Sequence, residues 1–231
     1  MRGPRIPSPQ NTFKKIVARI HSAGTHLLFP TPQHIRTLED STYADLVARF
    51  PKAVDAPYPF VRPVFVYRNE YIRKAVFHIK YRGNTALVDV FGETLLYETL
   101  SLLEEDPPAS FPVHIVPIPL SQARFTERGF NQSALLARSV ISKDTSGSLS
   151  YSPFLLERVK NTLPQTKLKK RERRRNVVNS FFVPNKYRRE LQRATVILVD
   201  DVTTTGSTLK DARRALIEAG AHEVKAVTLA H

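Results

Sequence analysis

The sequence predicts an α/β fold with a mainly parallel sheet, because strand patterns alternate with helix patterns over most of its 231 residues. The clearest strand is the apolar run 196–199, in which three of four residues are β-branched, as in a strand buried on both faces. A helix pattern follows, with one apolar face and a glycine at its end: Leu209, Ala212, Leu216, Ala219 and then Gly220.

The other elements of the first half follow in chain order. Residues 1–60 are the least regular part, with helical spacing of apolar residues at 11–22, a helical pattern at 43–50, and prolines breaking 26–60. A short strand is expected at 64–67. Two helices come next, one from about Ile72 to Gly83 and a longer one from about Val88 to Leu102, which Pro107 and Pro108 end.

The second half continues the alternation. Strands are expected at 114–117, 154–159, 180–183, 194–199 and 224–230, with a helix at 133–141. The chain therefore divides into residues 1–60, a short helical and irregular appendage, and residues 61–231, the α/β domain.

Composition narrows the classes of function. The chain has no cysteine, which excludes disulfides and thiolate metal sites, and its seven histidines show no zinc-binding spacing. No apolar run approaches the length of a membrane span, and residues 1–10 lack the apolar core of a signal peptide. We therefore expect a soluble cytoplasmic protein. Nothing in the sequence fixes its oligomeric state.

The formal charge of +14 is unevenly distributed. Residues 158–193 contain thirteen Lys or Arg against two Glu, which leaves a net of +11 in one segment. Such a run is usually a solvated face, but a polyanionic ligand and nucleic acid are the two partners that would use it.

The strand at 194–199 ends in two adjacent carboxylates, Asp200 and Asp201, and a turn of small hydroxyl residues around Gly206 leads into the next helix. Free backbone N–H groups at a helix N-terminus bind anions, and hydroxyls add donors. Acidic residues beside an anion site make sense when the ligand also carries vicinal hydroxyls or Mg²⁺. A phosphorylated sugar fits both halves, whereas the plain alternative is an ordinary strand–turn–helix.

This arrangement resembles the phosphoribosyl pyrophosphate (PRPP) signature of type I phosphoribosyltransferases over Asp200, Asp201, Thr204, Thr205, Gly206 and Thr208. The resemblance implies the corresponding parallel-sheet fold, a Mg²⁺·PRPP ligand and catalytic roles for both carboxylates, which would hold the ribose hydroxyls. The rest of the PRPP site would be the loop residues Thr203, Thr204, Thr205, Gly206, Ser207 and Thr208, which would surround the 5′-phosphate.

Three further stretches are similar to the ComF family of competence-associated phosphoribosyltransferase-like proteins. They are Lys80–Gly83, Val116–Gln132 with Arg124 and Arg128, and Leu163–Asn176. They occur in the family order, and the resemblance covers about residues 64–231. Members of this family usually begin with a cysteine-rich zinc module, which the absence of cysteine shows to be lost here, so we expect no bound zinc.

The resemblance makes Arg124 and Arg128 the best candidates for binding pyrophosphate, because the guanidinium fork suits phosphate oxygens. Lys80 is a third candidate, although a lysine at a helix end often only meets the helix dipole. Pro117–Pro119 either presents backbone N–H groups to the ligand or simply ends the strand, and Asn131 is expected chiefly to cap the next helix.

Two functions remain open. The first is an enzyme that displaces pyrophosphate from Mg²⁺·PRPP, with the basic residues Lys167, Arg173, Arg174 and Arg175 in a lid; no general base and no acceptor is evident. The second is a non-catalytic competence or DNA-uptake protein whose basic segment binds single-stranded DNA. The second has weak aromatic support, because only Phe181, Phe182 and Tyr187 accompany these charges between positions 158 and 193.

Overall fold

The computed structural model describes residues 32–108, 112–159 and 180–231. The predicted helix at 11–22 and the predicted lid at 167–175 lie outside these residues. Within them, no helix is long and apolar enough to cross a membrane.

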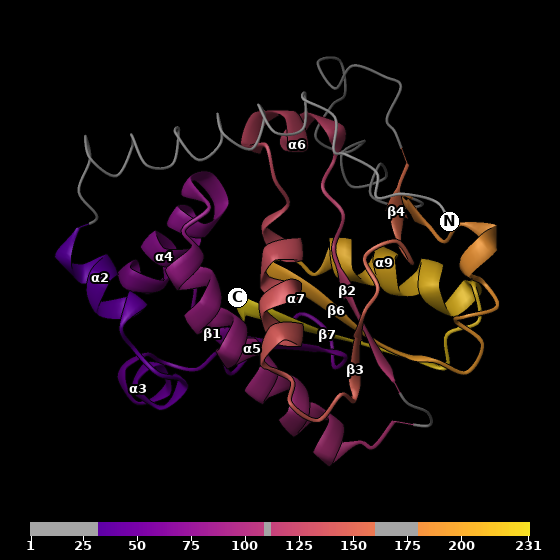
Figure 1. Cartoon of the computed structure of the whole chain (residues 1–231), viewed down its shortest axis with the longest axis horizontal. Helices are drawn as coiled ribbons and strands as arrows, with labels where there is room; N and C mark the ends of the chain where they lie inside the picture. The colour runs from indigo at the N-terminus through magenta and orange to yellow at the C-terminus, as the bar shows by residue number, and fades with distance from the viewer. Residues whose placement is uncertain (1–31, 109–111, 160–179) are drawn as a thin grey trace, which may run out of the picture.

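The centre of the fold is a five-stranded sheet whose paired strands all run parallel, in the order β1-β7-β6-β2-β3 (Figure 1). Its strands are β1 (Val61–Phe65), β2 (Val113–Pro117), β3 (Leu149–Tyr151), β6 (Thr195–Val202) and β7 (Glu223–Ala230). β6 and β7 pair over the longest register, from Thr195 opposite Glu223 to Val202 opposite Ala230. The prediction of an α/β fold with a mainly parallel sheet is confirmed.

Alternating side chains of the strands enter two separate cores, one on each face of the sheet. In β6, Ile197 and Val199 belong to the first core, whereas Val196 and Leu198 belong to the second. This alternation is the two-residue period of a strand, and it explains why 196–199 is apolar throughout.

Helices cover both faces (Figure 1). The first core contains α4 (Glu70–Arg82), α5 (Thr85–Glu105) and α7 (Gln132–Lys143), while α9 (Ser207–Glu218) packs into the second. Two short N-terminal helices, α2 (Gln33–Glu39) and α3 (Tyr43–Arg49), add Ile35, Leu38 and Leu46 to the first core. They therefore share a core with α4 and α5 instead of forming one of their own. The division at residue 60 stays a prediction.

Several helix ends follow from local chemistry. Asn69, Asn84 and Asn131 accept hydrogen bonds from backbone N–H groups at the starts of α4, α5 and α7. Gly83 ends α4 in the left-handed region, at φ 56°. The capping role expected for Asn131 is confirmed.

The strand predicted at 154–159 is wrong for its first half. Residues 149–151 form the edge strand β3 of the main sheet instead, and only Glu157–Arg158 forms a strand, β4. β4 pairs antiparallel with β5 (Phe181–Phe182), so the strand expected at 180–183 is a two-residue piece of a separate small sheet. Leu155 and Leu156 are buried from a turn, and their burial produced the apolar pattern.

We expect Gly92→Ala to destabilise the protein by roughly 1–3 kcal/mol, because the added methyl group would overlap the Ser139 side chain where α5 and α7 cross. Urea denaturation measures the free energy of unfolding. Ser139→Gly in the Gly92→Ala background removes the overlap, so the double variant should be more stable than the sum of the two single effects. Additive effects would show that the added methyl group does not meet the Ser139 side chain.

Candidate phosphosugar-binding site

The two carboxylates predicted to hold a ligand lie within the last residues of β6 and not after the strand, because β6 extends to Val202. Asp200 accepts hydrogen bonds from Ser133 Oγ at 2.7 Å and from the Asp201 N–H at 3.0 Å. Ser133 lies in the first turn of α7 and is fully buried. Sequence reasoning missed this serine, since it is separated from Asp200 by 67 positions.

Asp201 is almost completely buried, whereas Asp200 is partly buried. Asp201 Oδ1 accepts a hydrogen bond from the Val202 N–H at 2.8 Å, and Asp201 Oδ2 lies 3.0 Å from the Lys80 ammonium. That last approach is outside hydrogen-bond angles, so charge attraction holds the pair together. Lys80, proposed from the sequence as a pyrophosphate ligand, is in this structure the counter-ion of Asp201.

Burial and the charge of Asp201 raise the pKa of Asp200 to about 7, although the bonds from Ser133 and the Asp201 N–H and the charge of Lys80 act in the opposite direction. A carboxyl in this state takes up or releases a proton near neutral pH. Lys80 lies against Asp201, and within the described residues no cation pairs directly with Asp200.

The loop after β6 connects the carboxylates to α9. Thr203 is buried and its N–H is bonded to the Ala230 carbonyl, so it continues the sheet edge. Thr204 and Thr205 are exposed, and Thr205 Oγ1 lies 2.8 Å from Ser207 Oγ. Gly206 adopts φ 68° directly before α9, and no side chain caps that helix. Ser207 and Thr208, in the first turn of α9, are partly exposed, so the exposed part of the loop is the helix N-terminus.

Gly206 also contacts a segment from elsewhere in the chain. A Cβ built at this position would lie 2.8 Å from the Tyr58 ring and 2.9 Å from Pro57. Tyr58 in turn receives the Lys210 ammonium 5.3 Å from its ring centroid. The glycine is therefore required both by its backbone conformation and by the close approach of residues 57 and 58.

The predicted pyrophosphate arginines lie on α6 (Gln122–Arg128), a short helix that the sequence did not predict. Arg124 is exposed, while Arg128 is half-buried, with its guanidinium 5.1 Å from the Tyr81 ring centroid and Nη1 2.9 Å from Gln132 Oε1. The Arg128 Nε is buried without a hydrogen-bond partner in the described part of the chain. Before α6, the N–H of Ile118 is already bonded to Val199, so that group of the Pro117–Pro119 turn does not face a ligand.

Arg158 is a further candidate that the sequence singled out only as part of the basic segment. It belongs to β4, opposite Phe181 of β5, and its guanidinium lies 5.2 Å from the Phe181 ring centroid. Burial and the charge of Arg124 lower its pKa, and Asp200 and Asp211 oppose that shift. Arg158 and Arg124 are thus near enough to repel each other beside the carboxylate of Asp200. An anion between them would relieve this repulsion.

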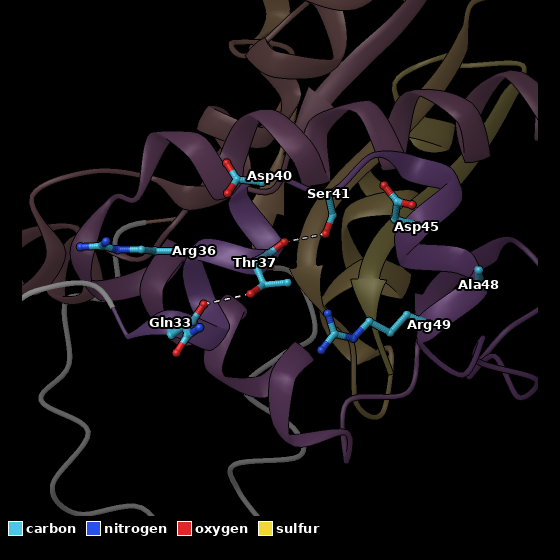
Figure 2. Close-up of a pocket in the computed structure, with 8 residues that line it drawn as sticks. All are labelled: Gln33, Arg36, Thr37, Asp40, Ser41, Asp45, Ala48 and Arg49. Carbon is cyan, nitrogen blue, oxygen red and sulfur yellow. Dashed lines mark hydrogen bonds between the residues drawn. The ribbon is translucent and has the colours of Figure 1, made fainter.

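A pocket lies between α2 and α3, away from these residues (Figure 2). Its hydroxyls are bonded within their own helix turns: Thr37 Oγ1 donates to the Gln33 carbonyl and Ser41 Oγ donates to the Thr37 carbonyl. Asp45 accepts from the Thr42 N–H as part of a helix cap. These groups have local structural partners, so the site at the end of β6 remains the candidate functional site.

A parallel sheet with paired carboxylates at the end of a central strand, followed by a Thr-Thr-Gly loop at a helix N-terminus, defines a type I phosphoribosyltransferase-like protein. Residues 145–231 match the phosphoribosyl transferase domain family. The chain is 33% identical to Competence protein ComFC of Bacillus subtilis over 169 residues, 73% of this chain and 62% of that protein.

Two further relatives match this chain at similar identity. Competence protein F of Haemophilus influenzae is 33% identical over 136 residues, 59% of this chain and 58% of that protein. The DNA utilization protein YhgH of Salmonella typhimurium is 30% identical over 150 residues, 65% of this chain and 63% of that protein. The matches span 58% to 63% of the length of these curated relatives. The chain is thus similar to phosphoribosyltransferase-like proteins of the ComF type, in agreement with the resemblance noted in its sequence.

We expect Asp200→Asn to be more stable than the parent at pH 8 and equally stable near pH 4. A carboxyl whose folded pKa is raised from 3.8 to about 7 loses stability as pH rises through that interval, because the folded state resists its ionisation. Asparagine cannot ionise and avoids this loss, which is on the order of 1 kcal/mol or more above pH 8. Chemical denaturation across this pH range measures the difference; a pH-independent difference would contradict it.

Asp201→Asn should act in the opposite direction and lower the free energy of unfolding by about 1–3 kcal/mol, because the largely buried Lys80 ammonium then lacks its counter-charge. Lys80→Met in the Asp201→Asn background removes the uncompensated charge and should recover most of the loss. Equal stability of Asp201→Asn and the parent in thermal and urea denaturation would show that the ion pair contributes nothing to folding.

Proposed function

We propose that this protein binds Mg²⁺·PRPP and acts as a phosphoribosyltransferase. The observation that carries the proposal is the direct continuity from Asp200 and Asp201 at the end of β6, through the loop around Gly206, to the start of α9. Within one short segment, carboxylates that can accept hydrogen bonds from sugar hydroxyls are followed by groups that can donate hydrogen bonds to a phosphate. A ribose bearing a 5′-phosphate has complementary groups in the same order.

The ribose end would bind through Asp200, whose carboxylate is oriented by Ser133 and accepts hydrogen bonds from sugar hydroxyls. Asp201 is buried and paired with Lys80, so it would not contact the ribose directly. Its role would be to hold the end of β6, and with it Asp200, in position. The 5′-phosphate would accept hydrogen bonds from the hydroxyls of Thr204, Thr205 and Thr208 and from backbone N–H groups at the start of α9.

The diphosphate end would lie towards Arg124, Arg128 and Arg158. The first two come from α6 after β2, the strand that neighbours β6, and Arg158 comes from the small β4–β5 sheet. Three guanidinium groups would stabilise charge that builds up on the leaving group. A Mg²⁺ ion would be held mainly by PRPP oxygens, where it would neutralise the diphosphate.

In the proposed reaction, the bond between the anomeric carbon and the diphosphate oxygen breaks, and the oxygen leaves with the electron pair. A nucleophilic atom of the acceptor forms the new bond to that carbon and releases any proton it carries to solvent. The transition state has oxocarbenium character, so the tasks of the protein are to position the two reactants, stabilise the leaving charge and exclude water.

The cellular setting is also a proposal. The relatives are named for competence and DNA utilization, and we propose that this chain works in the cytoplasm in a related process. Binding of single-stranded DNA is the alternative function, supported by the charge of residues 158–193. Calorimetry separates the two: saturable binding of Mg²⁺·PRPP supports the enzyme, whereas oligonucleotide binding with a steep salt dependence and no PRPP affinity supports the alternative.

We expect Asp200→Asn with Asp201→Asn to abolish Mg²⁺·PRPP binding in isothermal titration calorimetry, because the sugar hydroxyls lose their charged acceptor and the strand end loses the charge that pairs with Lys80. Circular dichroism at the titration temperature verifies that the variant is folded, and Lys80→Met can be added if it is not. Asp89→Asn, an exposed carboxylate paired with Lys143, is the matched control and should bind like the parent. Parental affinity in the double variant would show the assignment of the ribose site to be wrong.

A further inference from the structure

A cleft on the exposed face of α4 adjoins the carboxylate site. It is lined by Tyr67, Arg73, Lys74, Val76, Phe77, Lys80 and Tyr81. Lys80 extends from this cleft to within 3.0 Å of Asp201, and the Tyr81 ring lies under the guanidinium of Arg128. The cleft therefore borders the buried carboxylate on one side and a proposed diphosphate arginine on the other.

Two aromatic rings of the cleft are half exposed. Phe77 is 50% exposed and Tyr81 48%, and their ring centroids lie 5.0 Å apart at an interplanar angle of 40°. A single exposed aromatic residue needs no explanation. Two adjacent rings on successive turns of one helix, beside a charged site, instead form an open surface on which one planar ring can stack.

The polar part of the cleft is cationic. Its lining contains three basic residues and no carboxylate. Lys74 is paired with Glu70 at 2.6 Å and Lys80 with Asp201, whereas Arg73 has no ion pair within the described residues. Arg73 occupies the same face of α4 as Phe77, one turn away. A ring that stacks on Phe77 can therefore place an acidic substituent near an unpaired guanidinium.

We propose that this cleft is the acceptor subsite and that the acceptor is a planar aromatic ring bearing an anionic group. The proposal rests on the proposed transferase function, because only a reaction at the neighbouring ribose gives the cleft an acceptor to hold. The ring lies on Phe77 and Tyr81, its acidic group is directed to Arg73, and its opposite edge is directed to the carboxylate end of the cleft. Lys80 then connects acceptor binding to the charge of Asp201.

The arrangement favours a small molecule over a nucleic acid strand. Single strands are held by aromatic rings spread along a basic groove, one for each successive base. Here the two rings are adjacent, on successive turns of one helix, and suit one planar group. Binding of a strand is nonetheless a distinct outcome of the experiment below.

The test uses nicotinate as the planar acidic probe, nicotinamide as its uncharged match and cyclohexanecarboxylate as its non-planar match. Saturation-transfer NMR and calorimetry measure their binding to the full chain with Mg²⁺·PRPP present. Nicotinate should bind more tightly than both matches. Phe77→Leu and Arg73→Gln should each weaken nicotinate by about tenfold, as expected for loss of one stacking or charge contact. Neither variant should change Mg²⁺·PRPP affinity.

Tyr97→Leu is the matched control, because Tyr97 is 47% exposed on α5 and stacks on Tyr43 away from the cleft. It should leave nicotinate binding unchanged. The proposed function itself fails if the parent does not bind Mg²⁺·PRPP. The subsite alone fails if PRPP binds but the three probes bind equally or not at all, if Phe77→Leu and Arg73→Gln behave like the control, or if only a single-stranded oligonucleotide binds in a Phe77-dependent way.

Discussion

Two consecutive carboxylates at the end of a buried strand impose the main constraint on this structure. Successive side chains of a strand point to opposite faces, so Asp200 and Asp201 cannot share one solvated position. Asp201 shares the face of Ile197 and Val199 and lies beneath α4, where a carboxylate needs a counter-charge, and Lys80 supplies it. Asp200 has a hydrogen bond from Ser133 of α7 and no direct cation partner among the described residues, and burial together with the charge of Asp201 raises its pKa. The strand end therefore fixes where α4 and α7 meet the sheet.

The same constraint sets the chemistry of the ligand. A purely anionic ligand at the end of β6 would meet the charge of Asp200, and a purely cationic one would meet Arg158, which Arg124 neighbours. The proposed ligand, with hydroxyls at its centre and phosphates at both ends, would satisfy both sets of groups. Because burial holds the pKa of Asp200 near neutrality, donors that stabilise its charged form would also change its protonation. Ligand binding and proton release are thus physically linked at this residue.

The sequence predicted the parts of the fold and site that depend on local pattern. β6 was predictable because its apolar run is continuous, and β7 because most of its residues are apolar and buried. The loop from β6 into α9 was predictable because its residues are consecutive, while its role in binding phosphate stays a prediction. β3 was not predictable, since three residues of an edge strand carry too little pattern, and α6 buries no residue at all. The pairs Lys80–Asp201 and Ser133–Asp200 join distant parts of the chain, so only the packing of α4 and α7 on the sheet brings them together. The position of Arg158 likewise depends on the small sheet formed by the two-residue strands β4 and β5.

The N-terminal helices are connected to the phosphate loop through the segment that follows them. α2 and α3 are anchored by apolar burial in the first core, in a chain without the cysteines that a thiolate metal site would need. After α3, the backbone of Lys52 forms an isolated antiparallel β-bridge with Phe65 of β1. The chain then brings Pro57 and Tyr58 against Gly206. Since Gly206 has no room for a side chain beneath that contact, the shape of the loop depends on where residues 57 and 58 lie. The segment between α3 and β1 is therefore a structural part of the proposed phosphate site, although no residue of it belongs to the sequence signature.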